Sequence, residues 1–81
     1  MHIVAIHDIS QPDKFWPTVQ QTEIPAGIKL HSSLPNQGGT RAVCHWEADS
    51  VEAVRSLVDG AVGRYSKNDF YEVATENAMG L

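Results

Sequence analysis

Hydrophobic positions along the chain predict four strands. Residues 2–9 are nearly continuous in apolar, β-branched character, which is typical of a central strand covered on both faces. Residues 28–34 and 41–48 alternate between apolar and polar positions, as half-buried strands do. The glycine-containing turn between these two segments predicts that they pair as a hairpin. Residues 69–74 are expected to form a fourth, shorter strand.

Two segments carry the start signals and the apolar spacing of helices. The first helix is expected over about residues 13–22, with Pro17 in its first turn or at a kink, because an interior proline costs about 3 kcal/mol. The second is expected to begin at Asp49, which together with Glu52 fits the spacing of a capping box. Valines three and four residues apart give this second helix one apolar face. Residues 75–81 are expected to form a tail that packs across a sheet edge or a partner chain.

The order strand, helix, two strands, helix, strand predicts an α+β fold of the ferredoxin-like type. Right-handed crossover connections then give the antiparallel sheet the strand order 4-1-3-2, with the first and third strands in the centre. Both helices cover one face, so the other face is expected to meet water or another subunit. The chain has no repeat and no linker, and residues 1–81 are expected to form a single domain.

Composition and charge narrow the classes of partner. The longest apolar runs are only a few residues, and no basic flank precedes a long apolar segment near Met1, so neither a membrane span nor a secretory signal is expected. A net charge of −4 with scattered Lys and Arg gives no basic stripe, so nucleic acid is not an expected partner. The single cysteine, Cys44, cannot form an intrachain disulfide, which fits a cytoplasmic protein. A chain of 81 residues lies near the lower limit of independent packing, which favours a homodimer.

Strand alternation in the hairpin brings polar side chains to the face without helices. Pairing even residues with even ones, through a three-residue loop at 37–39, places the even, mostly apolar positions of both strands against the helices. His31 then lies opposite or diagonal to His45, and both point away from the helices. Ser33 and Glu47 have the same parity and are expected nearby.

The first strand is expected to add a third histidine to this surface. Val4 and Ile6 are the expected core pair beneath the helices, which leaves His7 on the opposite face with its odd-numbered neighbours. His2 has the parity of Val4 and lies at the terminus, so it is expected to be solvated. The candidate ligand-binding residues are therefore His7, His31, His45, Glu47 and Ser33.

Three imidazoles and a carboxylate match the ligand preferences of zinc, nickel or copper. The candidate metal ligands are His7, His31 and His45, and nickel or zinc is the expected ion. Two other interpretations stay open. The histidines are polar residues of a dimer interface or a water-filled cavity, or they line a pocket for a small molecule. Cys44 is expected to be a small core residue and no nucleophile.

The chain also resembles a known family in three segments. These are AVCHWEADSVEAVR at residues 42–55, KFW at residues 14–16 and ENA at residues 76–78. They are similar to segments of small uncharacterised bacterial proteins of the dimeric α+β barrel kind, one related group of which has been described as nickel-binding. The resemblance spans most of the chain and implies a homodimer in which two four-stranded sheets pack face to face.

Two function classes follow. The first is a binding protein that holds a small ligand or a transition metal on the helix-free sheet face. The alternative, which the resemblance implies, is a cofactor-independent enzyme of the monooxygenase, isomerase or cyclase type, in which one of the three histidines acts as acid or base. No Walker loop, Rossmann fingerprint or GxSxG motif is present. Imidazole nitrogens that converge on one point favour a metal, whereas a single histidine in a closed apolar cavity favours catalysis.

Overall fold

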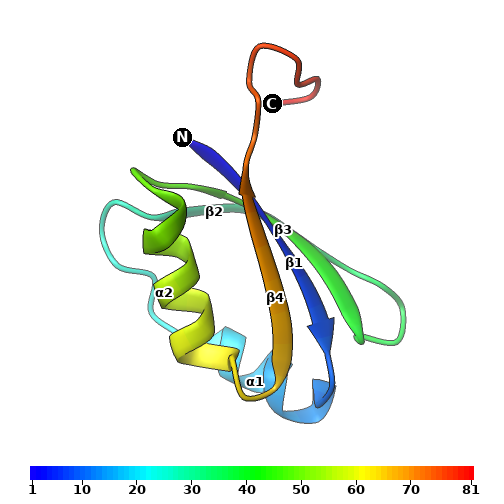
Figure 1. Ribbon diagram of the computed structural model, residues 1–81. Helices are drawn as coiled ribbons and strands as arrows, with labels where there is room; N and C mark the ends of the chain where they lie inside the picture. The colour runs from blue at the N-terminus through cyan, green and yellow to red at the C-terminus, as the bar shows by residue number, and fades with distance from the viewer.

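Six elements follow one another in the order predicted from the sequence (Figure 1). The structure is a computed structural model that describes residues 1–81. Its elements are β1 (His2–Ile9), α1 (Pro12–Gln21), β2 (Lys29–Pro35), β3 (Arg41–Glu47), α2 (Val51–Val62) and β4 (Ser66–Glu72). The chain is therefore α+β, as predicted, and neither helix is long and apolar enough to cross a membrane.

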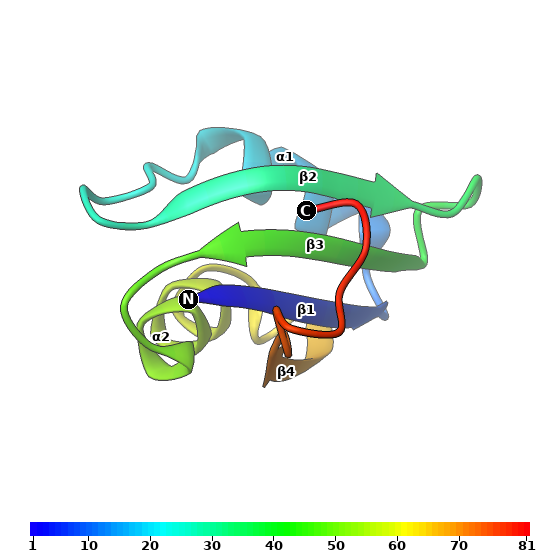
Figure 2. The ribbon, with the colours of Figure 1, turned by 90° about the horizontal axis from the view of Figure 1, so that it is seen from above.

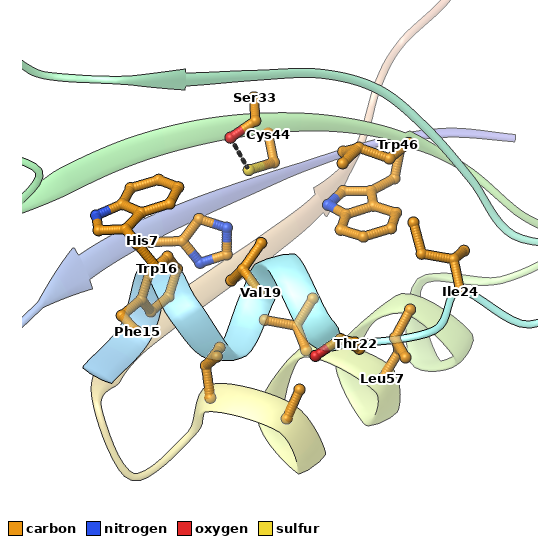
Figure 3. A pocket seen from close by; sticks show the side chains of 14 residues that line it. His7, Phe15, Trp16, Val19, Thr22, Ile24, Ser33, Cys44, Trp46 and Leu57 are labelled. Carbon is orange, nitrogen blue, oxygen red and sulfur yellow. Dashed lines mark hydrogen bonds between the residues drawn. The ribbon is translucent and has the colours of Figure 1, made fainter. Parts of the chain in front are cut away.

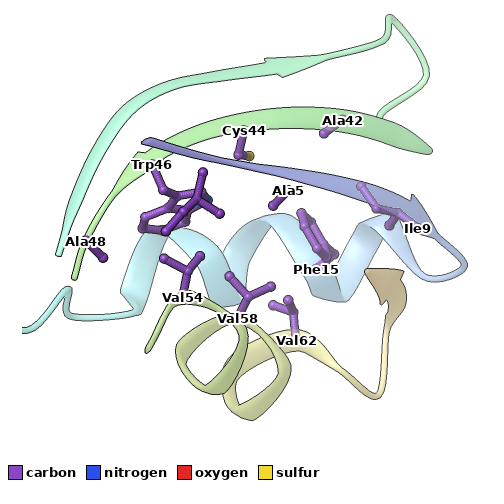
Figure 4. Packing of buried hydrophobic residues seen from close by; sticks show 11 residues of the cluster. Ala5, Ile9, Phe15, Ala42, Cys44, Trp46, Ala48, Val54, Val58 and Val62 are labelled. Atoms are coloured by element: carbon purple, nitrogen blue, oxygen red, sulfur yellow. The ribbon is translucent and has the colours of Figure 1, made fainter. Parts of the chain in front are cut away.

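The four strands form one antiparallel sheet in the order β2-β3-β1-β4 (Figure 2). This is the predicted order 4-1-3-2 counted from the other edge, with β1 and β3 in the centre. Both helices lie on one side of the sheet (Figure 4). The element order and the sheet are compatible with a ferredoxin-like fold.

The boundaries of three elements differ from the prediction. Pro17 lies inside α1 and not in its first turn. The helix begins at Pro12 instead. The cap of α2 is Ser50, whose hydroxyl accepts the backbone N–H of Ala53 at 3.1 Å, so the predicted cap at Asp49 is wrong by one residue. β4 begins at Ser66, earlier than predicted, because its first residues are polar and carry no apolar signal.

The core lies between the sheet and the two helices (Figure 4). Helix α2 contributes one valine from each of three successive turns, and α1 contributes Phe15, one of the largest fully buried side chains. The buried hydrophobic cluster consists of Ile3, Ala5, Ile9, Phe15, Ala42, Cys44, Trp46, Ala48, Val54, Val58 and Val62. The expectation that Cys44 belongs to the core is confirmed.

The facing of β1 is the reverse of the prediction. Ile3 and Ala5 are fully buried against the helices, whereas Val4 and Ile6 are only partly buried and lie on the helix-free face. Both sets are apolar, so the alternation of these four residues does not decide between the faces. The even set also contains Asp8, which is exposed, and burying an unpaired carboxylate is costly. The odd set is therefore the one that faces the core.

A β-bulge at His31 changes the facing of β2 beyond that point. Before the bulge, Leu30 lies opposite Trp46 as predicted, but after it Ser33 lies opposite Cys44 and Leu34 opposite Val43. Ser33 thus faces the helices, and Leu34 lies on the other face with 65% of its surface exposed.

The turn is the reason for the register change, and the predicted loop at 37–39 is wrong. The side-chain oxygen of Asn36 accepts the backbone N–H groups of Thr40 at 2.9 Å and Arg41 at 3.2 Å, which gives a wider turn over residues 36–41. A wider turn shifts the pairing by one residue, and the bulge restores the predicted pairing further along the strand.

The tail leaves the sheet beyond β4. The backbone N–H of Val73 donates to the carbonyl of His2 at 2.8 Å, and after this bond the chain extends away from the body of the protein (Figure 1). Met79 is 96% exposed, so the tail does not pack across an edge of its own sheet. Packing against a partner chain stays a prediction.

Candidate functional site

Three histidines from three neighbouring strands gather on the helix-free face of the sheet. They are His2 of β1, His31 of β2 and His45 of β3, and we call them the histidine cluster. The predicted pair of His31 and His45 is therefore brought together as expected. The third member is His2 and not His7, because the facing of β1 is reversed.

The rings of the histidine cluster are close enough to interact directly. Nδ1 of His2 lies 2.9 Å from Nε2 of His45. The ring centroids of His31 and His45 are 4.7 Å apart and stacked, and that of His2 lies 5.1 Å from His45 and 5.7 Å from His31. One ring nitrogen from each residue lies within 4.8 Å of the other two.

This spacing is near what a metal ion requires. A tetrahedral ion with metal–nitrogen bonds of about 2.0–2.1 Å holds its nitrogens roughly 3.4 Å apart. The nitrogens of the cluster lie within 4.8 Å of one another and must therefore come closer together to share one ion. Pairing of β1 with β3 is regular, whereas His31 lies at the bulge of β2, between the paired residues Leu30 and Ser32.

Glu47 is the carboxylate of the site, as predicted. Its Oε1 lies 2.8 Å from Nε2 of His31. A carboxylate only accepts, so His31 donates this hydrogen bond, and a neutral His31 then carries its lone pair on Nδ1. Carboxylates that accept the second ring N–H of a ligating histidine fix the tautomer and orientation of that ring at metal sites.

The surroundings of the cluster favour a neutral imidazole at His45 and an ionised carboxylate at Glu47. Burial lowers the pKa of His45, and the neighbouring His31 and His2 lower it further, against an opposing effect of Glu47. The hydrogen bond from His31 lowers the pKa of the Glu47 carboxyl. Both directions suit a cation, because a metal needs imidazole lone pairs and is attracted by negative charge.

His7 is absent from this face, and its predicted placement is wrong. It is 2% exposed and lies against the helices, with its ring centroid 5.6 Å from that of Phe15. Its Nδ1 is hydrogen-bonded to Oδ1 of Asn68 at 2.6 Å. Burial lowers the pKa of His7, against the raising effects of Asn68 and Asp59.

Ser33 is also separated from the cluster. After the bulge its hydroxyl lies on the helix-facing side, where it accepts the Cys44 thiol at 3.5 Å. Burial raises the pKa of this thiol, so Cys44 stays protonated and is a poor nucleophile.

One residue of the cluster, His2, was not predicted from the sequence to belong to it. His2 was expected to be solvated, and it is partly buried beside His45. The signal that identifies it is the exposed Asp8: both have even numbers in β1, so they share a face, and the charged Asp8 marks that face as the one without helices. No protein-family model, curated protein or solved structure matches the chain.

Proposed function

We propose that this protein binds a divalent transition metal ion through His2, His31 and His45. The observation that carries the proposal is the convergence of three imidazole nitrogens within 4.8 Å of one another from three neighbouring strands. Imidazole is a preferred ligand of nickel, zinc and copper, whereas magnesium and calcium prefer oxygen. Nickel or zinc remains the expected ion.

The ion replaces a proton in the free protein. Two imidazole nitrogens 2.9 Å apart share one proton between His2 and His45, since two lone pairs in contact repel each other. Metal binding needs both lone pairs, so this proton moves to the other nitrogen of its own ring and the ion takes its place between the two rings. Glu47 holds His31 in place and adds a negative charge beside the ion.

A titration with nickel, zinc and copper followed by calorimetry tests this proposal. We expect one ion per chain, and a loss of affinity of more than about tenfold in each of His2→Gln, His31→Gln and His45→Gln. Lys29→Gln is the matched control. Lys29 lies opposite Glu47 in the sheet, but its ammonium group has no lone pair with which to bind the ion. Equal affinity in the wild type and the three histidine variants would contradict the proposal.

The homodimer belongs to the same proposal. The helix-free face presents Val43 and Tyr71, which are 41% and 51% exposed, beside the partly buried Val4 and Ile6. A second copy packed on this face would cover the apolar side chains and enclose the histidine cluster. Sedimentation velocity with and without zinc tests it, and a monomer at high concentration in both conditions would contradict it.

The histidine cluster does not support the enzyme alternative, because three imidazoles converge on one surface, whereas a single histidine in a closed apolar cavity favours catalysis. His7 is the histidine in apolar surroundings. The cytoplasmic location stays a prediction that rests on the single cysteine.

A further inference from the structure

A cavity lies between the sheet and the helices, on the opposite side of the sheet from the histidine cluster (Figure 3). Its volume is about 80 Å³, and 11 of its 14 lining residues are hydrophobic. A water molecule needs about 10–15 Å³, so the cavity has room for roughly five to eight non-hydrogen atoms. It is therefore large enough for a small organic molecule.

Trp46 brings an unpartnered hydrogen-bond donor to this cavity. Its side chain lines the cavity and is 7% exposed, and its Nε1–H has no hydrogen-bond partner. Trp16 lines the same cavity, but its Nε1–H donates to the carbonyl of Gly39 at 2.9 Å. Buried donors in native proteins are nearly always paired, so the free N–H of Trp46 indicates a missing acceptor.

His7 brings an acceptor whose tautomer is fixed by its neighbours. The Asp59 carboxylate can only accept, so the Asn68 amide nitrogen that lies 2.9 Å away donates to it. The Asn68 oxygen must then face His7, where it accepts from Nδ1 at 2.6 Å. With its proton on Nδ1, neutral His7 carries its lone pair on Nε2.

The two hydroxyl groups of the lining each make a hydrogen bond within the protein. The Thr22 hydroxyl donates to the carbonyl of Thr18 at 2.7 Å, and the Ser33 hydroxyl accepts the Cys44 thiol. A water molecule in this apolar cavity would find few of the two to four partners that it needs. Among the buried side chains of the lining, the Trp46 N–H and the His7 Nε2 are the polar groups without a hydrogen-bond partner.

We propose that the cavity binds a small, largely apolar molecule of about five to eight non-hydrogen atoms that carries a carbonyl and a hydroxyl group. The carbonyl oxygen accepts from Nε1 of Trp46, and the hydroxyl donates to Nε2 of His7. Figure 3 shows the two residues at opposite parts of the cavity, with His7 beside Phe15 at one end and Trp46 at the other, which suits one ligand lying between them.

The route into the cavity passes the segment that follows α1. Ile24 lines the cavity and is 42% exposed, so it lies at the boundary between the cavity and solvent. It belongs to the irregular segment between α1 and β2.

A spectroscopic test uses the wild-type protein in the presence of a chelator, so that its outcome does not depend on the proposed metal site. Cyclohexanone carries the acceptor, methylenecyclohexane has the same shape without it, and 4-hydroxycyclohexanone carries both groups. In a ¹H–¹⁵N spectrum we expect cyclohexanone to move the indole N–H resonance of Trp46 downfield, and methylenecyclohexane not to do so. The Trp16 resonance serves as internal control, and 4-hydroxycyclohexanone should also move the His7 Nε2 resonance.

Variants then assign the effect. In Trp46→Phe the ratio of cyclohexanone to methylenecyclohexane affinity should fall about threefold to tenfold, the effect of one hydrogen bond. Trp16→Phe makes the same change of size in the same cavity and should leave the ratio within about twofold. An unchanged Trp46 resonance in the wild type at saturating cyclohexanone, or an unchanged ratio in folded Trp46→Phe, would overturn the proposal. An unchanged His7 resonance would overturn the hydroxyl assignment.

Discussion

Nδ1 of His2 lies 2.9 Å from Nε2 of His45, although the two residues are 43 positions apart in the sequence. Antiparallel pairing of β1 with β3 places His2 opposite Glu47 and Val4 opposite His45, so His2 and His45 are diagonal neighbours on one face. His31 joins them from β2 through a bulge. The sheet therefore brings together three histidines that do not form a local sequence motif.

Glu47→Gln should weaken metal binding without removing a ligand. Glutamine keeps the size of the side chain and an oxygen that can accept the His31 N–H, but it loses the negative charge. We expect the affinity for nickel or zinc to fall about tenfold, as it does when the carboxylate partner of a ligating histidine is changed at known sites. Calorimetric titration measures this, with Glu76→Gln in the tail as control; equal losses in the two variants would contradict the role of Glu47.

Acidification should destabilise the fold through His7. Burial lowers its pKa from the usual 6.5, so the unfolded chain takes up the proton first as the pH falls. The contribution of His7 to the free energy of unfolding is therefore present in full above about pH 6.5 and is lost progressively as the pH falls below that value. The free energy of unfolding in urea, measured between pH 7.5 and pH 5, should decrease more steeply in the wild type than in His7→Gln. Identical slopes would show that His7 is not buried neutral.

Gly39→Ala should destabilise the turn. Gly39 has a φ of +70°, and a Cβ at this position would lie 2.9 Å from Nε1 of Trp16, which donates to the Gly39 carbonyl. The strained φ alone costs about 1–2 kcal/mol. Gly38→Ala is the matched control, because its φ is not positive and its Cβ would meet only Thr40 at 3.9 Å. Thermal unfolding should separate the two variants, and equal melting temperatures would count against this account of the turn.

Ser50→Ala should cost about 1 kcal/mol of stability through loss of the helix cap. The Ser50 hydroxyl is the group that accepts the Ala53 N–H at the start of α2. Asp49→Ala, one residue earlier, removes no such bond and should cost less. Urea denaturation of both variants measures the difference in the free energy of unfolding. A larger loss of stability for Asp49→Ala would indicate that Asp49 is the cap, as the capping-box pattern predicts.

Element order and strand order were predictable because they depend on signals that add up over many residues. The valines of α2 and the alternation of residues 41–48 extend over several turns or positions, and the crossover rule then leaves few topologies. Helix capping was predicted to within one residue. It depends on a single side chain, and Asp49 and Ser50 are both good caps by composition.

The candidate site was harder to predict, because single residues decide toward which side of the sheet the side chains of a strand point. β1 is apolar on both faces, and only Asp8 distinguishes them, so His7 was placed on the wrong side and His2 was passed over. The bulge at His31 offsets a turn one residue wider than predicted, in which the Asn36 side chain accepts backbone N–H groups, and a pattern of apolar positions shows neither feature. His31, His45 and Glu47 were placed correctly because β3 alternates clearly and the bulge leaves His31 on the predicted face.

The most direct test of the metal proposal is a crystal structure of the nickel-loaded protein with diffraction data collected at the nickel absorption edge. We expect one anomalous peak per chain on the helix-free face, about 2.0–2.2 Å from one nitrogen each of His2, His31 and His45. A peak at the terminal amine or at His7, or no ordered ion with the histidine cluster unchanged, would contradict the account.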